Sequence, residues 1–244
     1  MFQTVKKRLY REAFLTSPLA ILISPIYIIR NGLYKAIRHA APNIQGNTLD
    51  LGCGSKPYES LFTHTKSYIG VDVKCSGHNH KNSKIDHYYD GKTLPFSSHS
   101  FDSVVSFEVL EHIFNIDEIF NEIHRVLKPD GIVLISIPFA WDEHEIPHDF
   151  ARYTSYGILH IFQNHGFDVL ELKKTTTYVL AVFQMFIAYL YQHVAPKNLL
   201  FSKTFQLLLI FPLNVLAILL NCILPKRYEY FCNSVVMAKK LEEA

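Results

Sequence analysis

The chain has 244 residues, of which 49% are hydrophobic and 19% are charged, and its formal net charge is +2. This length is sufficient for one large domain with a buried core, or for a domain with an insertion. The near-neutral charge argues against a surface that coats nucleic acid, so we expect no nucleic-acid partner. The four cysteines lie far apart without a CxxC pair, which favours a reducing, cytoplasmic setting over a disulfide framework.

Residues 1–44 are predicted to form a helical extension that is basic at its start and apolar further on. The basic residues lie in MFQTVKKRLYREAF, and two prolines interrupt the apolar stretch LTSPLAILISPIYII that follows. This stretch is too short and too interrupted to predict a membrane span. The next residues, RNGLYKAIRHA, have a helical pattern.

A glycine turn follows an apolar strand end at residues 49–58, LDLGCGSKPY, and Pro57 suits the first turn of a helix. Strand, glycine turn and helix bring backbone close to nucleotide-like ligands in α/β folds. Asp72 closes the run YIGVDV about 20 residues later, where a ribose-binding carboxylate is expected. Lys56 and Pro57 stand where a dinucleotide site needs its third glycine, which favours a ligand without phosphate, such as S-adenosylmethionine. The alternative is a tight turn in another kind of α/β protein.

Between Thr48 and Lys174, strand-like and helix-like segments alternate, which predicts a parallel sheet with helices on both faces. One amphipathic helix is expected to end at Pro129–Gly131, and a second to begin near Thr154 or Ser155 and end at Gly166. The predicted strands after the glycine turn are 68–73, 102–107, 132–139, 168–176 and, as the last strand, 228–240.

The ordered segments LDLGCG, VDV, YDGKTLPF, FDSVVSFEVLEHI and EIHRVLKPDGIVLISIPF resemble the motifs of the class I S-adenosylmethionine-dependent methyltransferases, in the subgroup often called type 11. The resemblance covers roughly residues 45–175 and the final strand. It implies an α/β, Rossmann-like fold: a seven-stranded, mostly parallel sheet with helices on both faces and an antiparallel last strand. It also implies a methyltransferase whose cofactor is S-adenosyl-L-methionine.

The same resemblance implies the residues that bind the cofactor. Asp50, Gly52, Cys53 and Gly54 would line its methionine and ribose end, and Asp72 would accept hydrogen bonds from the ribose hydroxyls. Asp90 and Gly91 would lie at the adenine. Phe107 and Glu108 would lie at the end of the predicted strand 102–107.

The segment after the predicted strand 132–139 is rich in ionisable residues and lies at the sheet edge where loops build substrate pockets. Methyl transfer to an oxygen requires removal of a proton, and we predict His144 or His148 as the base. Asp149 would orient the histidine, and Arg152 would hold an anionic group of the acceptor. The alternative is that these residues form a salt-linked loop without a catalytic role.

Residues 144–148, HEIPH, have the letters of the HExxH zinc-protease motif. That motif requires a helix, and Pro147 removes a helical hydrogen bond. No third ligand is evident in the sequence, so we predict no metal site. Glu111 and His112 are expected to begin the helix after the predicted strand 102–107, either as site residues or as a solvated helix start.

Residues 178–226 form an apolar insertion before the last strand, with two apolar segments at 178–194 and 205–224. The second segment approaches the roughly 20 residues needed to cross a bilayer, and the first is shorter. Gln184, Pro212 and Asn214 would be costly in lipid unless they face protein. Three structures are consistent with this pattern: a helical hairpin lying in the membrane surface, a buried cap or homodimer interface, and a two-span hairpin. Basic residues flank the apolar segments and suit an anionic cytoplasmic leaflet.

We therefore expect three parts: an extension (1–44), a methyltransferase domain (45–177 and 227–244) and an apolar hairpin (178–226). The predicted function is methyl transfer at the cytoplasmic face of a membrane, with the protein peripheral to it or partly embedded, on a lipid-linked or cell-envelope glycan acceptor. The alternatives are a soluble methyltransferase of small molecules with a hydrophobic lid, and a cofactor-binding scaffold without catalysis.

Overall fold

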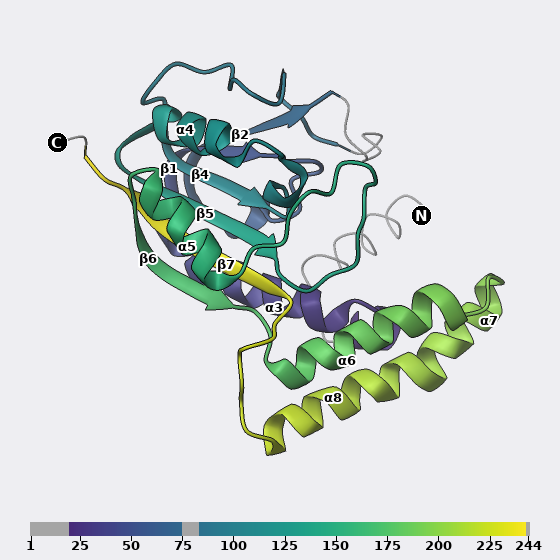
Figure 1. Ribbon diagram of the computed structural model, residues 1–244. Helices are drawn as coiled ribbons and strands as arrows, with labels where there is room; N and C mark the ends of the chain where they lie inside the picture. The colour runs from purple at the N-terminus through teal and green to yellow at the C-terminus, as the bar shows by residue number, and fades with distance from the viewer. Residues whose placement is uncertain (1–19, 75–82, 243–244) are drawn as a thin grey trace. The chain divides into compact units, whose positions relative to one another are not determined.

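In a computed structural model, which describes residues 20–74 and 83–242, the chain divides into two compact units (Figure 1). The larger unit contains Ile37–Lys173 and the chain from Ser234 onward, and we call it the sheet unit. The other contains the described residues up to Ala36 together with Lys174–Asn233, and we call it the hairpin unit.

A seven-stranded sheet forms the centre of the sheet unit, with the strand order β3-β2-β1-β4-β5-β7-β6. The neighbours from β3 to β5 pair in parallel, whereas β7 lies antiparallel between β5 and β6. This topology confirms the predicted Rossmann-like fold. The strands are β1 (Gln45–Leu51), β2 (His64–Val73), β3 (His87–Tyr89), β4 (Phe101–Phe107), β5 (Leu127–Pro138), β6 (Phe167–Lys174) and β7 (Asn233–Lys240).

Two helices cover the sheet beside β5 and β6 (Figure 1): α4 (Ile116–Val126) and α5 (Ser155–Asn164). Their apolar faces share one core with the strands, and the rings of Phe120 and Phe162 meet edge to face at 5.0 Å. Thr154 caps α5, because its Oγ1 accepts a hydrogen bond from the Gly157 amide at 3.0 Å. The predicted start of this helix is therefore confirmed.

The predicted helix after the glycine turn is wrong: residues 55–63 hold only the 3-10 turn η2 (Glu59–Leu61). Lys56 has φ of +55°, outside the right-handed helical region, and the Tyr58 side chain is buried. The chain therefore turns inward where the sequence pattern suggests a helix.

Other predicted boundaries also differ from those in the structure. Helix α4 ends at Val126 rather than at Pro129–Gly131, because Leu127 is already extended and pairs with Phe101 of β4. Glu111 and His112 lie in the 3-10 turn η4 (Leu110–His112) and do not begin an α-helix. Strand β7 starts at Asn233, so residues 228–232 precede it.

The hairpin unit consists of helices. Helices α2 (Ala20–Ile23) and α3 (Tyr27–Ala40) come first, although the end of α3 belongs to the sheet unit. The insertion then supplies α6 (Tyr178–Tyr189), α7 (Leu199–Phe205) and α8 (Phe211–Ile223), with π-helical turns at Leu190–Val194 and Gln206–Ile210. Among the described residues, the continuous helix Leu199–Ile223 is long and apolar enough to cross a membrane, by length and composition.

Polar side chains of the insertion face protein. Gln184 is fully buried: its Oε1 accepts a hydrogen bond from the Ile29 amide (3.0 Å), and its Nε2 donates one to the Pro25 carbonyl (2.9 Å). Asn214, also fully buried, donates to the Ser24 carbonyl at 3.4 Å. These backbone groups lie at the end of α2 and the start of α3, where amides and carbonyls lack partners within their own helix. Their side-chain partners thus join the first helices to the hairpin.

Candidate cofactor and acceptor site

The carboxyl ends of the parallel strands bring the predicted cofactor residues to one edge of the sheet. Asp50 lies near the end of β1 and Asp72 near the end of β2, where β1 pairs with β2 through Leu51 and Val71. Phe107 ends β4, the other neighbour of β1. Ligands of open α/β sheets bind at this edge, where the strand order reverses.

Asp50 is a buried carboxyl group at this edge, with 3% of its surface exposed. Burial raises the pKa of Asp50 to about 7, although the Tyr68 hydroxyl donates a hydrogen bond to its Oδ2 at 2.8 Å. A group in this state would be stabilised as a carboxylate by a cationic ligand. Tyr68 begins the apolar run of β2, and nothing in the sequence pattern marks it as a site residue.

The glycine turn has the backbone that its sequence predicts. Gly52 and Gly54 have φ of +69° and +45°, a region that side chains rarely adopt. The Gly52 amide donates to the Val71 carbonyl (2.8 Å), and the Gly54 amide donates to Oδ2 of Asp72 (3.1 Å). The Asp72 carboxylate therefore holds the turn directly.

The Lys56 side chain fixes the path of the turn through buried contacts, a role that its sequence position does not reveal. The residue is 8% exposed, and its Nζ donates to the Tyr68 carbonyl (3.1 Å) and to Oδ2 of Asp86 (2.5 Å). The same Asp86 oxygen accepts a hydrogen bond from the Gly70 amide (2.7 Å). Lys56 and Asp86 thereby tie the turn to β2.

Cys53 contributes backbone to the turn, whereas its thiol is buried beneath it. A Cβ added to Gly70 would lie 2.6 Å from the Cys53 sulfur, so Gly70 provides the space for this side chain. Burial raises the pKa of the Cys53 thiol above its usual range. The thiol is therefore a packing group and not a nucleophile.

Aromatic rings line the inner side of the turn. Phe107 stacks parallel to Phe62 at 6.1 Å, and Tyr58 meets Phe107 edge to face at 5.1 Å. Phe62 also stacks on Tyr68, whose hydroxyl contacts Asp50. The predicted cofactor residue Phe107 is thus one member of a rigid aromatic cluster.

Asp90 and Gly91 form a turn after β3. The Asp90 Oδ1 accepts hydrogen bonds from the amides of Lys92 (2.9 Å) and Thr93 (2.8 Å), and Gly91 has φ of +86°. These two amides lower the pKa of Asp90. The carboxylate retains acceptor capacity for an amino group.

These residues fit S-adenosylmethionine. The buried Asp50 suits the ammonium group of the methionine end, and Asp72 retains lone pairs for the ribose hydroxyls because a carboxylate has about four acceptor sites. At Gly54 an added Cβ would meet nothing within 4 Å, so the turn leaves open space on that side. No part of this surface requires a phosphate.

On the acceptor side, the structure joins three of the predicted residues. Arg152 contacts both Asp149 oxygens through its two terminal nitrogens, at 2.5 and 2.7 Å, and these hydrogen bonds lower the pKa of Asp149 to about 2. The Asp149 Oδ2 lies 3.3 Å from Nδ1 of His144 and accepts a hydrogen bond from the His144 amide (2.9 Å). Asp149 is therefore placed to orient His144, as the sequence predicts.

His148 is exposed. Its carbonyl oxygen accepts a hydrogen bond from Nδ1 of His112 at 2.7 Å. Residues 144–148 form a turn and not a helix, so the two histidines of HEIPH do not share a helix face.

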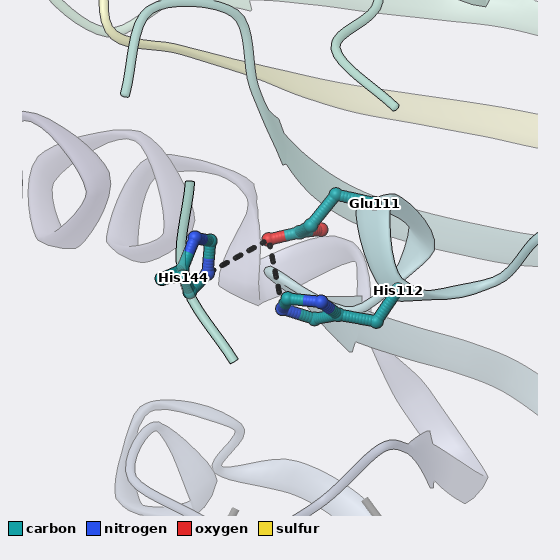
Figure 2. A group of neighbouring side chains, drawn as sticks. All are labelled: Glu111, His112 and His144. Atoms are coloured by element: carbon teal, nitrogen blue, oxygen red, sulfur yellow. Dashed lines mark ion pairs between the residues drawn. The ribbon is translucent and has the colours of Figure 1, made fainter. Parts of the chain in front are cut away.

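Two glutamates after β4 approach the same place. Glu108 has φ of +56°, and its Oε1 accepts a hydrogen bond from the Ser136 hydroxyl at 2.7 Å. Glu111 is completely buried beside the rings of His112 and His144 (Figure 2). Burial, and next the charge of Glu108, raise the pKa of Glu111 well above its usual range. The sequence shows both glutamates but not their proximity to His144, which lies 33 residues after Glu111.

Comparisons with known proteins find methyltransferases among the relatives of this chain. Residues 49–135 match a family model described as "Methyltransferase domain". A protein of Mycolicibacterium smegmatis named "Probable S-adenosylmethionine-dependent methyltransferase" is 31% identical over 148 residues, which are 59% of this chain and 55% of that protein. A sterol 24-C-methyltransferase of Debaryomyces hansenii is 26% identical over 122 residues, 45% of this chain and 32% of that protein. The chain thus spans about half, or less, of the length of these relatives.

A solved structure has the same fold. The crystal structure of an S-adenosylmethionine-dependent methyltransferase from Mesorhizobium loti superposes with a TM-score of 0.52 at 15% identity, covering 86% of this chain and 98% of that one. At this identity the likeness shows the fold alone.

Proposed function

We propose that the chain is a class I S-adenosylmethionine-dependent methyltransferase, which transfers the cofactor's methyl group to an acceptor at the carboxyl edge of the sheet. The observation that carries this proposal is the convergence of Asp50, the glycine turn and Asp72 at the ends of β1 and β2. S-adenosylmethionine supplies an activated methyl group when bound. The protein contributes the orientation of the reactants, which is the largest source of rate in such a transfer.

Titration calorimetry with S-adenosylmethionine and with its demethylated product tests this proposal. We expect micromolar binding of both ligands, because the residues described above would bind the parts that the two ligands share. A folded protein that binds neither ligand would contradict the proposal and favour a scaffold role.

For an acceptor with a hydroxyl group, we propose His144 as the residue that receives the proton. Its Nδ1 faces Asp149, which leaves Nε2 for the acceptor. Arg152 uses both terminal nitrogens on Asp149, so we assign it the positioning of Asp149 and no longer the binding of an anionic acceptor. His148 contributes its carbonyl to His112 and is the weaker candidate for the base.

We further propose that the hairpin unit binds a membrane surface. Its polar residues Gln184, Gln206 and Asn214 are buried, whereas apolar side chains are exposed. A water-soluble pair of helices buries its apolar side chains and exposes its polar ones. The opposite distribution seen here is suited to contact with lipid. The large apolar residues that are at least half exposed on the insertion are Phe186, Tyr189, Val194, Leu199, Leu200, Phe201, Leu207, Leu208, Leu219 and Ile223.

A membrane-bound enzyme would find its acceptor in the same membrane, so we propose a lipid-linked acceptor: an isoprenoid precursor, a lipid, or a sugar of a lipid-carried glycan. The sterol methyltransferase relative, whose named substrate is itself apolar, supports this class of acceptor. Basic residues such as Lys197, Lys226 and Arg227 flank the apolar helices and suit the anionic cytoplasmic leaflet.

Co-sedimentation with vesicles of phosphatidylethanolamine and phosphatidylglycerol tests membrane binding. The variant Leu199→Ser/Leu200→Ser/Phe201→Ser changes three residues that are 63–75% exposed, so its folding should be unaffected. We expect it to lose most of its vesicle binding. Tyr156→Ser, which changes an 82% exposed residue of the sheet unit, is the matched control and should bind as the wild type does.

A homodimer through the hairpin is the alternative that the same variants distinguish. If the wild type stays in the supernatant with vesicles and sediments as a dimer in analytical ultracentrifugation, and the triple variant sediments as a monomer, the exposed face is a protein interface and the membrane proposal is wrong.

A further inference from the structure

The Glu111 side chain is a buried carboxylate without a hydrogen-bond partner. The residue is 0% exposed, and within residues 20–74 and 83–242 neither carboxylate oxygen meets a hydrogen-bond donor. A carboxyl group removed from water is stable either with its proton, which the raised pKa of Glu111 favours, or as a carboxylate beside a positive group. Arg152, the nearby cation, directs both terminal nitrogens to Asp149.

His112 presents a lone pair to Glu111. Its Nδ1 lies 2.7 Å from the His148 carbonyl oxygen, which can only accept a hydrogen bond, so Nδ1 carries the hydrogen. In the neutral ring Nε2 is then unprotonated. This atom lies 3.8 Å from Oε1 of Glu111.

His144 presents a second lone pair to the same oxygen. Its Nδ1 lies 3.2 Å from the Asp142 carbonyl and 3.3 Å from Oδ2 of Asp149, and both oxygens are acceptors. The Arg152 nitrogen near this atom is more distant, at 3.5 Å, so the protonated Nδ1 is favoured. Nε2 of His144 is then unprotonated, and it lies 4.0 Å from Oε1 of Glu111.

Three electron-pair donors therefore converge on one point (Figure 2). The ligand atoms of Glu111, His112 and His144 all lie within 4.8 Å of one another. Separations of 3.8 and 4.0 Å are too long for hydrogen bonds, so no hydrogen bond joins Glu111 to either ring nitrogen. We propose that these three side chains bind a divalent transition-metal ion.

The surroundings of the two histidines support this proposal. Metal-binding imidazoles usually donate their other N–H to a carbonyl or carboxylate, which fixes the tautomer and the ring direction. Here the His148 carbonyl has this role for His112, and Asp149 together with the Asp142 carbonyl has it for His144. The two rings meet edge to face at 4.7 Å and 78°, so both are held.

The donor set indicates the class of ion. Two imidazoles and one carboxylate suit zinc, iron or manganese, whereas calcium and magnesium prefer oxygen ligands. Three protein ligands leave a coordination position open, which is typical of a metal site that takes part in a reaction. An acceptor hydroxyl bound there would release its proton to solvent water more readily, and its oxygen would then take the methyl group from the sulfonium sulfur, so that His144 would act as a ligand in place of a base. This role rests on the proposed methyl transfer, but the ion site itself does not.

The HEIPH letters of the sequence are a misleading guide to this site. The protease motif would pair His144 with His148, yet His148 is not a member of the group and contacts His112 through its carbonyl oxygen. The structure pairs His144 with Glu111 and His112 from the segment after β4 instead.

Calorimetric titration of the full, tag-free chain with Zn²⁺ and with Mn²⁺, after treatment with a chelator, tests the proposal. Mn²⁺ is included because cysteine thiolates compete for zinc but bind manganese poorly. We expect about one equivalent of each ion to bind to the wild type. Glu111→Gln and His144→Gln should each weaken binding at least about tenfold, because each removes a ligand. His148→Gln keeps the carbonyl, and His160→Gln lies on the surface of α5. Both should bind as the wild type does.

Failure of this proposal can be distinguished from failure of the proposed function, because the same samples are titrated with S-adenosylmethionine. If the protein binds the cofactor but binds neither Zn²⁺ nor Mn²⁺, the metal site alone is rejected. Ion binding that is unchanged in both Glu111→Gln and His144→Gln would also reject it. His144 is partly exposed, so His144→Gln remains informative if Glu111→Gln fails to fold.

Discussion

The Asp72 carboxylate accepts a hydrogen bond from the Gly54 amide at 3.1 Å, so the predicted ribose-binding group also holds the glycine turn. Its other oxygen accepts from the Val73 amide at 2.8 Å. The orientation of this carboxylate is thus fixed before any ligand arrives, and preorganised groups bind ligands at a smaller entropic cost.

Asp72→Ala should weaken binding of S-adenosylmethionine by at least about 10- to 100-fold, because the loss of even one hydrogen bond to a charged group costs about 1.5–3 kcal/mol. Titration calorimetry measures the change. Asp72→Asn keeps one oxygen acceptor and should lie between the wild type and Asp72→Ala. An unchanged affinity in Asp72→Ala would show that the ribose is bound elsewhere.

Cofactor affinity should depend on pH through Asp50. The pKa of Asp50 is about 7 in the folded protein, so the carboxyl group is largely neutral at pH 5.5 and half ionised at pH 7. The ammonium group of the cofactor requires the ionised form, so affinity should rise about tenfold between these two pH values. Calorimetry across this range tests the expectation. Asp50→Asn should bind weakly at both values, and a pH dependence that survives this substitution would assign the titration to another group.

The same raised pKa has a consequence for stability. An unfolded aspartate has a pKa near 3.9, so the folded state holds its proton more tightly than the unfolded state does. The Asp50 contribution therefore favours folding below about pH 4 and is lost as the pH rises to about 7. Urea unfolding of Asp50→Asn should show a smaller loss of stability over this range than the wild type shows.

Lys56→Ala should lower the free energy of unfolding by about 1–3 kcal/mol, because it removes the Lys56 ammonium from the Tyr68 carbonyl and from the Asp86 carboxylate, which keeps only the Gly70 amide. Urea denaturation measures this change. Lys84→Ala is the matched control: Lys84 forms an exposed ion pair with Glu59, and exposed pairs contribute about 0–1 kcal/mol. Equal effects of the two substitutions would mean that the buried contacts of Lys56 do not stabilise the turn.

Gly52→Ala should destabilise the protein more than Gly54→Ala. A side chain at φ above zero costs about 1–2 kcal/mol at either position. At Gly52 the added Cβ would also lie 2.4 Å from a Val109 methyl group, which adds about 1–3 kcal/mol, whereas at Gly54 it meets nothing within 4 Å. Urea denaturation compares the two variants. The double variant Gly52→Ala/Val109→Ala should recover part of the loss, and a strictly additive result would exclude the clash.

The path of the turn around Lys56 and the end of α4 show where sequence patterns fall short. Pro57 and the proline–glycine pair after α4 are local signals, and both suggest helix boundaries that the structure does not have. In both places a tertiary contact overrides the local preference: the buried Lys56 turns the chain inward, and pairing of Leu127 with Phe101 begins β5 early.

The sequence by itself determined the class of fold and the cofactor motifs. These depend on strand periodicity, on glycines at φ above zero, and on acidic residues at strand ends, all of which are local properties. Only the tertiary structure decided which side chains meet: Lys56 with Asp86, Gln184 with the start of α3, and Glu111 with His144. Such pairs are separated by 30 to 155 positions along the chain, and no local periodicity records them. They are set by how the elements pack, because the fold decides which buried polar groups lie close enough to interact.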